Sequence, residues 1–369
     1  METPKKKKIG KLIWRIVRRF FLLLFTLVLL LVAGLAMLCN QIFNGPSETA
    51  RDVLTMSLLE ASATKWVPAL FIGEDTVKEI QSSIDSTLPA DVSNSSQIVI
   101  QSGLVDGAGN SEWKDHPDGI RIESVKGDTF TAHVMIVRDP SAVFVGTSLS
   151  EGQKFATSLP GKPINIAMAE KGVIAAVNGG AFLDNGTSSP IVGSVPKGLV
   201  LSEGKVVWND GRSYNGFVGI TEDNILLVAN TMTAARAQEL KIRDGCCFGP
   251  VLLMDGVINE TAYNQNSGYN PRTAIGQRAD GAIILLCIDG RQLGSMGGTY
   301  RDIINIMVEY GAVNACNLDG GSSTVMFYKD DYGKYGTDGE LVMINSYSLL
   351  QETPRKMPTY IMVRGSSED

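Results

Sequence analysis

Carboxylates, arginines and amides in glycine-rich turns are the residues of this 369-residue chain that could do chemistry. The chain has only two histidines. His133 lies inside a strand-like run, where a structural role is expected, and His116 precedes a proline in a loop. The sequence therefore argues against a Ser–His–Asp or Cys–His enzyme. The five cysteines show no CxxC or Cys/His spacing, so we expect neither a disulfide framework nor a zinc site.

The first candidate site lies in a predicted β-hairpin. Two strand-like runs are joined by Asp280-Gly281, a strong hairpin signal. If those two residues form the loop, Arg272 lies directly opposite Asp289, with about 5 Å between the Cβ atoms. A guanidinium would then lie beside a carboxylate at the open end of the hairpin. The alternative is a surface ion pair worth at most about 1 kcal/mol. A different loop length would shift the register and separate the pair.

The second candidate site is a glycine turn at the end of an apolar strand. Its polar and glycine residues are Asn317, Asp319, Gly320, Gly321, Ser322 and Ser323. Such a turn presents a carboxylate beside unobstructed backbone N–H groups, which bind anions and phosphate in particular. The alternative is a tight turn that Asp319 merely caps.

An earlier segment repeats the pattern that leads to this turn. The spacing of Glu170, Gly172, Ala176 and Asn178 equals that of Glu309, Gly311, Ala315 and Asn317, and a Gly-Gly pair follows each set, at 179–180 and 320–321. Each set is typical of a helix end, a glycine cap, a short buried strand and an Asn-containing turn. We predict that the two turns meet in one region of the fold. The alternative is a chance similarity between two ordinary helix–strand turns.

A folded domain must position these sites. Alternating apolar and polar runs, separated by turn signals, recur from about residue 118 to the C-terminus with few helical windows. We predict one α+β domain over residues 116–366, with a mixed, mainly antiparallel sheet and a few helices. One of the helices begins with a capping box formed by Thr299 and Asp302. Residues 40–115 are expected to form a stalk and connecting region.

The N-terminal segment has the composition of a membrane anchor. Residues 20–39 carry no charge, and a helix of that length spans the roughly 30 Å hydrocarbon core of a bilayer. The basic tail of residues 1–19 is predicted to stay cytoplasmic, with the domain on the outer side of the cell membrane. A cleaved signal peptide is the alternative.

The charge of the chain is uneven. The chain has 33 basic and 39 acidic residues, and eight of the basic ones but only two of the acidic ones precede residue 51. An excess of acidic residues in the remainder argues against nucleic-acid binding.

Several motifs together resemble the phosphodiester glycosidase family. They occur in the family's order and are 177–182, 272–276, 289–291, 297–299 and 317–324. The resemblance runs from about residue 118 to Val363 and includes Asn345 and Arg355. This sequence departs from the family pattern at Asp302, where the family more often has Glu. It departs again after Gly320-Gly321, where many members have a third glycine instead of serine.

The resemblance implies hydrolysis of a glycosyl-1-phosphodiester, of the N-acetylglucosamine-1-phosphate diester type, in envelope or exopolysaccharide metabolism. It implies that Arg272 and the N–H groups of residues 320–322 bind the phosphate. Asp289 or Asp319 would activate water or meet the anomeric carbon. Phe182 would either stack on the sugar or lie in the core. The implied substrate-binding residues are Asn178, Gly179, Gly180, Arg291, Asn317, Gly320, Gly321, Ser322 and Ser323.

The expected partners are a sugar-phosphodiester or envelope glycan and, through the N-terminal helix, a membrane. No cofactor is expected, although a metal role for Asp289 or Asp319 stays open. Two functions of other classes are alternatives. One is a membrane-tethered glycosyl-phosphate transferase of envelope-polymer assembly, which would use the same phosphate site and exclude water. The other is a non-catalytic glycan-binding module.

Overall fold

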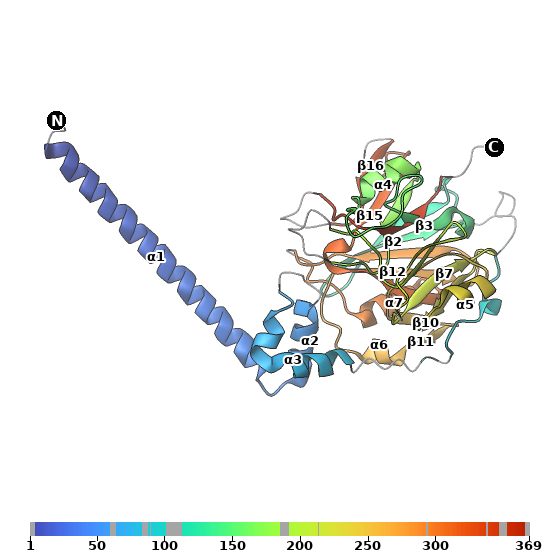
Figure 1. Ribbon diagram of the computed structural model, residues 1–369, viewed down its shortest axis with the longest axis horizontal. Coiled ribbons are helices and arrows are strands. Elements are labelled where there is room, and N and C mark those ends of the chain that lie inside the picture. Colours follow the sequence, from blue (N-terminus) through green and yellow to red (C-terminus); the bar gives the residue numbers. More distant parts are fainter. Residues whose placement is uncertain are drawn as a thin grey trace.

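The computed structural model describes residues 4–59, 64–82, 88, 90–100, 113–184, 192–212, 214–292, 294–336, 339–346 and 353–365. One long helix, α1 (Pro4–Phe43), extends away from a unit of packed sheets and shorter helices (Figure 1). The predicted α+β class with mainly antiparallel sheets is confirmed, because all the strand pairs named below are antiparallel.

Three sheets build the domain. The first has the order β1 (Ile120–Lys126), β2 (Thr131–Val137), β13 (Ile283–Ile288), β12 (Arg272–Arg278), β14 (Ala312–Leu318), β10 (Val251–Met254) and β11 (Val257–Ile258). The second has the order β16 (Glu340–Met343), β15 (Met326–Asp330), β4 (Ala175–Asn178), β17 (Thr359–Val363) and β3 (Val143–Thr147). The third has the order β6 (Lys205–Asn209), β5 (Leu199–Ser202), β9 (Ile242–Cys247), β7 (Phe217–Thr221) and β8 (Leu226–Ala229).

One buried apolar cluster is shared by the three sheets. Ile275 of the first sheet, Val177 of the second and Val218 of the third belong to one buried cluster. Strands buried on both faces read as continuous apolar runs, which is why β13 is apolar throughout. The turns at the strand ends are therefore fixed by a shared core.

Helices cover the outer faces of the sheets. The described helices of the domain are α4 (Ile164–Lys171), α5 (Ala234–Glu239), α6 (Glu260–Asn264) and α7 (Tyr300–Glu309), with short 3₁₀ turns at 95–97, 140–142 and 321–323. The α7 helix packs its buried Ile303 and Met307 on the first sheet. Its predicted capping box is confirmed, because Thr299 Oγ1 accepts from Asp302 N and Asp302 Oδ2 accepts from Thr299 N. Asp302 therefore completes the capping box without a glutamate at this position.

The two predicted helix–strand units are present. The α4 helix leads through Gly172 into β4, and α7 leads through Gly311 into β14. Both glycines have left-handed backbone conformations, with φ of 63° and 80°. This conformation favours glycine, as the cap pattern in the sequence indicates.

The cysteines of the domain behave as small core residues. Cys246, Cys247, Cys287 and Cys316 are buried and unbonded. Burial raises the pKa of the Cys247 thiol to about 11. These thiols are therefore protonated and chemically inert at neutral pH.

The described parts of residues 40–115 contact the domain. Ser93 N donates to the Val228 carbonyl and Ser93 Oγ accepts from Val228 N, so this segment is bonded to β8. The α2 helix (Glu48–Leu59) contributes Ser57, whose Oγ accepts from Tyr269 N over 3.0 Å. The boundary at residue 116 stays a prediction, and residues 101–112 of the connecting region lie outside the described residues.

The α1 helix has the length and composition of a membrane span over Trp14–Phe43. Its large apolar side chains are exposed along this stretch. Such a helix near the N-terminus could be a membrane anchor or a signal sequence. It is followed by α2 and by α3 (Val67–Ser82), which lie together at its C-terminal end (Figure 1).

Candidate active site

The two glycine turns predicted from the sequence repeat meet in the structure. The side-chain amide of Asn178, at the end of β4, donates to the carbonyl of Asp319, just after β14. The backbone N–H of Asp319 donates to the carbonyl of Gly179 over 3.2 Å. The prediction that both units deliver their turns to one region is therefore confirmed.

Asn178 holds this junction from inside the protein. Its Oδ1 accepts from Thr273 Oγ1 at 2.7 Å and from the N–H of Val325 at 3.2 Å. The side chain is fully buried and connects a strand of the second sheet to strands of the first. Its position suits the support of the turns and not the sugar contact that the family resemblance implies.

Glycine is required in the turns because other backbone segments approach closely. A Cβ on Gly180 would lie 2.6 Å from the carbonyl oxygen of Cys247. A Cβ on Gly320 would lie 2.8 Å from the carbonyl oxygen of Pro271. Real Cβ atoms do not approach that closely, so any larger residue would push these segments apart. The turns are consequently fixed against β9 and β12.

Asp319 borders a cavity of about 170 Å³. Side chains that line it include Asp184, Lys197, Tyr214, Phe248, Asp319 and Arg355. The Asp319 carboxylate accepts a hydrogen bond from the N–H of Gly320 over 3.0 Å. Burial, and then the charge of Asp319, raises the pKa of Tyr214 to about 12, so its phenol is a neutral donor at physiological pH. The cavity thus combines two carboxylates, a neutral hydroxyl and two cations, and one of the carboxylates, Asp184, is paired with Arg355.

Arg355 is the more firmly held of the two cations. It forms an ion pair with Asp184, and its second terminal nitrogen donates to Ser322 Oγ over 3.3 Å. Its guanidinium carbon lies 4.9 Å from the ring centroid of Phe182. The arginine therefore covers the face of Phe182, which packs in the core behind it. This arrangement favours the core role of Phe182 over the sugar-stacking role.

Asp289 lies at the end of β13, in a second depression of about 80 Å³. Ser322 borders both depressions. The Asp289 carboxylate is only 3% exposed, and its Oδ1 accepts from the N–H of Ser346 over 2.9 Å. Its Oδ2 lies 3.2 Å from Nε2 of His133, whose Nδ1 lies 3.2 Å from Ser124 Oγ. His133 thus contacts a candidate catalytic carboxylate, and its expected structural role stays a prediction.

The predicted pairing of Arg272 with Asp289 is wrong. Arg272 lies opposite Ile288, one residue away from the predicted register. The hairpin loop has three residues and not two, because Arg278 N donates to the Ala282 carbonyl around a turn that ends in Gly281 with φ of 97°. A left-handed glycine after a turn is the usual ending of a three-residue loop. One extra loop residue shifts every pair, and this removes the contact.

Arg272 itself is enclosed by the protein. Its guanidinium donates to the carbonyls of Ser267, Gly268 and Gly298 and stacks on the Tyr300 ring at 4.4 Å. The residue is 2% exposed. Three carbonyl acceptors and an aromatic face satisfy the cation, so its position suits the positioning of loops and not phosphate binding.

Two of the three backbone donors expected to bind phosphate are occupied. The N–H of Gly320 donates to the Asp319 carboxylate, and the N–H of Gly321 donates to the carbonyl of Pro271. The geometry therefore does not support the expected role of the 320–322 backbone as a phosphate cradle.

Three buried polar atoms near the second turn have no hydrogen-bond partner in the part of the chain that the structure describes. They are Asn317 Oδ1, Ser323 Oγ and Thr324 Oγ1. The Asn317 amide nitrogen donates to the Gly249 carbonyl, which fixes the direction of the oxygen. Buried polar atoms normally have a partner, so these atoms call for water or a bound ligand. Arg291, by contrast, is exposed at the rim of the Asp289 depression and donates to Asn270 Oδ1.

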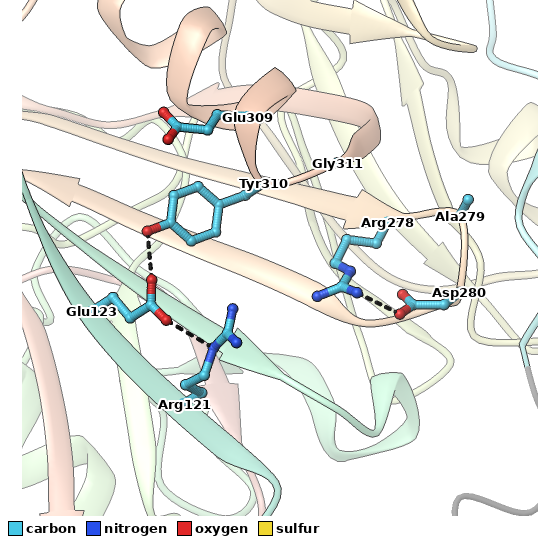
Figure 2. Close-up of a pocket in the computed structure, with 8 residues that line it drawn as sticks. All are labelled: Arg121, Glu123, Arg278, Ala279, Asp280, Glu309, Tyr310 and Gly311. Carbon is cyan, nitrogen blue, oxygen red and sulfur yellow. Dashed lines mark hydrogen bonds and ion pairs between the residues drawn. The ribbon is translucent and has the colours of Figure 1, made fainter. Parts of the chain in front are cut away.

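A larger hollow of about 600 Å³ lies at the opposite end of β12 (Figure 2). The strand runs from Arg272 to Arg278, about 20 Å at the usual rise per residue. Both arginines of the hollow are paired with its carboxylates, since Arg121 contacts Glu123 and Arg278 contacts Asp280. We therefore place the candidate active site at the glycine turns and not in this hollow.

Within the described ranges, no three His, Cys, Asp or Glu side chains are grouped closely enough to hold a metal ion. Four lining residues carry no motif signal in the sequence: Asp184, Lys197, Tyr214 and Phe248. They reach the cavity through tertiary contacts, such as the hydrogen bond from Lys197 N to the Ala181 carbonyl beside the first turn.

The chain is similar to proteins of one known family. The family model described as phosphodiester glycosidase matches residues 171–364, a stretch that contains both glycine turns, Asp289 and Arg355. A prophage-derived uncharacterized protein of Bacillus subtilis (strain 168), YomE, is 34% identical over 100 residues. That match covers 26% of this chain and only 16% of the relative's length.

A similar solved structure is the catalytic domain of zebrafish N-acetylglucosamine-1-phosphodiester alpha-N-acetylglucosaminidase, auto-inhibited by its pro-peptide. The TM-score is 0.52 at 22% sequence identity, over 66% of this chain and 82% of that one. At this identity the likeness establishes a common fold.

Proposed function

Because this chain belongs to the phosphodiester glycosidase family, we propose that it hydrolyses a glycosyl-1-phosphodiester at the bond between the sugar C1 and the phosphate oxygen. The observation that carries the proposal is the cavity beside Asp319, where this carboxylate, a neutral phenol, Lys197 and the Arg355–Asp184 ion pair converge. A phosphodiester needs the cations, and an anomeric centre that becomes positive needs the carboxylate.

Arg355 and Lys197 bind the phosphate in this proposal. Arg355 is held by Asp184, Ser322 and the Phe182 ring, so its guanidinium keeps a fixed direction at the cavity wall. Guanidinium groups bind phosphate oxygens through charge-assisted hydrogen bonds. This assignment replaces Arg272, whose donors are directed at backbone carbonyls.

Asp319 meets the anomeric carbon or activates the attacking water. It lies on the cavity wall, only partly buried, at the junction of the two turns. The hydrogen bond from the N–H of Gly320 holds the direction of its carboxylate. Tyr214 donates to a sugar hydroxyl or to the departing oxygen, because its raised pKa of about 12 keeps the proton on the phenol.

Asp289 is the second carboxylate, after Asp319, that we assign to the reaction. It faces the adjacent depression, which shares Ser322 with the Asp319 cavity. Two donors fix its carboxylate, so little reorganisation is needed during reaction. The unpartnered hydroxyl of Thr324, which lines the Asp289 depression, supplies a polar contact for the sugar or for ordered water.

The bond changes of the proposed reaction balance. The C1–O bond to phosphate breaks, the water oxygen bonds to C1, and the water protons end on the new sugar hydroxyl and on the phosphomonoester. A phosphate is already a good leaving group, so the scarcity of histidines is no obstacle.

We propose further that α1 anchors the chain in a membrane, with its basic N-terminus cytoplasmic and the domain outside. The basic residues precede the apolar stretch and no comparable cluster follows it. The substrate is then an envelope or exopolysaccharide glycan that can be reached from the bilayer.

The test uses the full chain in detergent micelles, with UDP-N-acetylglucosamine and synthetic sugar-1-phosphodiesters as substrates. Wild type should release free sugar, and Asp319→Asn should lower kcat/KM by about 100-fold or more, the scale for one positioned catalytic group. The matched control is Asp223→Asn, an exposed aspartate, which should retain full activity.

Full activity of Asp319→Asn would remove Asp319 from the mechanism. The absence of free sugar from every phosphodiester tested would contradict the hydrolase itself. Reaction in ¹⁸O-labelled water with an acceptor glycan present separates hydrolysis, which puts the label on C1, from transfer.

A further inference from the structure

The first part of α3 presents an apolar surface next to the end of α1. We propose that the segment Trp66–Ile72, which we name the apolar limb, lies in the interfacial layer of the membrane that α1 spans. The limb would be a second contact of the protein with lipid. The inference rests on the proposed anchoring role of α1 and goes beyond the hydrolase proposal.

The exposure of the apolar limb is the first observation. Trp66 is 62% exposed and Leu70 is 69% exposed, although both are large and apolar. They are four residues apart, the spacing that places side chains on one face of a helical turn. No charged residue occurs from Trp66 to Gly73. An apolar face of this kind in water is uncommon unless it meets a partner or a membrane.

The position of the limb along α1 is the second observation. Phe43, the last residue of α1, is buried against Phe71 of the limb, with ring centroids 5.1 Å apart. Phe43 is four residues beyond Cys39, the end of the uncharged stretch, which corresponds to about 6 Å along the helix. A headgroup layer is about 5–8 Å thick. The Phe43–Phe71 contact therefore falls within this layer when residues 20–39 span the hydrocarbon core.

The polarity of α3 changes at one residue. Gly73 has φ of 79° and ψ of 158°, so the helix is broken there. Beyond it the exposed side chains are polar, and four of them are charged: Glu74, Asp75, Lys78 and Glu79. Before the limb lies the exposed Lys65, whose ammonium can reach lipid phosphates. A helix that is apolar before its kink and mostly charged after it fits the membrane–water interface.

The favoured occupant of the apolar limb is lipid. The limb adjoins the end of a helix with the composition of a membrane span, and tryptophan is enriched at the membrane–water interface. Two exposed side chains offer far less than the roughly 800 Å² per partner of a standard protein interface. A second copy of the chain would therefore gain little stability here.

The experiment uses the full chain in nanodiscs of phosphatidylcholine and phosphatidylglycerol. Cys39→Ala removes the one cysteine outside the buried core, and Leu70→Cys then carries an environment-sensitive fluorophore. Glu79→Cys, on the charged part of α3, is the matched control, and Val28→Cys reports on insertion of α1. Brominated lipids quench probes near the bilayer, and iodide quenches probes in water.

The probe at Leu70 should be blue-shifted in nanodiscs, quenched by lipids brominated near the headgroup and protected from iodide. This corresponds to burial of an apolar face by about 5–10 Å at the headgroup boundary. The probe at Glu79 should show the reverse pattern. Quenching of Leu70 by iodide alone, with Val28 quenched by lipid, overturns the inference and leaves the anchor intact.

Two other outcomes also overturn the inference. A blue shift at Leu70 without quenching by brominated lipid means that protein, such as a second copy, covers the limb. Failure of Val28 to respond to brominated lipid means that α1 is not an anchor. Neither outcome bears on sugar release, so the hydrolase proposal is tested separately.

Discussion

The two ends of β12 carry hollows that differ in size and in chemistry. The end at Arg278 opens into about 600 Å³, and the end at Arg272 adjoins cavities of about 170 and 80 Å³. In the large hollow, charged side chains neutralise one another at the surface, as Figure 2 shows for Glu123 with Arg121 and for Arg278 with Asp280. At the glycine turns, both aspartates receive hydrogen bonds from backbone N–H groups.

At the two ends of β12, the volume of a hollow does not indicate its chemistry. The ion pairs in the large hollow are partly exposed and therefore screened by solvent, so they contribute little. Polar groups at the turns are fixed before any ligand arrives, which is what lowers the cost of stabilising charge in a reaction. Substitutions at the two ends of β12 should therefore differ in their effect on activity, in five ways.

Replacing Asp289 should have the largest effect of the five. Asp289→Asn keeps the shape of a side chain that is almost fully buried but removes its charge. We expect a loss of about 100-fold in kcat/KM, with the melting temperature little changed, because one charged group of the site is removed. A loss smaller than about threefold, measured by sugar release, would exclude a direct role.

Arg355→Gln should weaken substrate binding. The change removes the cation that we assign to the phosphate and leaves Asp184 without its ion-pair partner. We expect KM to rise by about tenfold or more with a smaller change in kcat, because a charge-assisted bond contributes about 1.5–3 kcal/mol. Equal KM values for wild type and variant, at matched ionic strength, would remove Arg355 from phosphate binding.

His133 should act through Asp289. His133→Phe removes one of the two hydrogen-bond partners that fix the Asp289 carboxylate, so kcat should fall by about fivefold with KM little changed. His133→Gln, whose amide can occupy the place of Nε2, should restore kcat in part. A purely structural role predicts loss of stability in both variants and no selective loss of kcat.

The two tyrosines with raised pKa values allow a direct comparison. Burial is the main cause for both, and each pKa is raised to about 12, with Asp319 adding to the shift of Tyr214 and Glu123 to that of Tyr310. Asp319→Asn should lower the pKa of Tyr214 alone and Glu123→Gln that of Tyr310 alone, because removing a negative neighbour favours phenolate. Tyrosine-labelled NMR titration, assigned with Tyr→Phe variants, measures both.

Arg278→Ala, in the large hollow, should have the smallest effect. It breaks the exposed pair with Asp280 and should change kcat/KM by less than about twofold, since a surface pair contributes at most about 1 kcal/mol to stability. A loss comparable to that of Arg355→Gln would reverse our choice between the two hollows.

Local patterns allowed much of the fold to be predicted. The glycine caps at Gly172 and Gly311 and the capping box of Thr299 depend on residues within one turn of each other, so the sequence contains the whole signal. The meeting of the two turns was predictable because both units repeat one spacing. The antiparallel α+β class followed from the alternating runs.

The predictions that were wrong or incomplete depend on contacts between residues far apart in the sequence. The hairpin register depended on the backbone angle of Gly281, which permits a two-residue or a three-residue loop. The surroundings of Arg272 are formed by Ser267, Gly268 and Gly298, which have no pattern that relates them to it. Lys197 and Tyr214 come to Asp319 from separate loops, so only the packing of the sheets places them together.

The position of β17 makes the first glycine turn depend on a distant segment of the chain. This strand lies between β3 and β4, and the N–H groups of Gly179 and Gly180 donate to its Thr359. The first turn therefore has no fixed position until residues 359–363 have been inserted between these two strands. A truncated polypeptide that lacks this segment would keep the residues of the first turn but not their geometry.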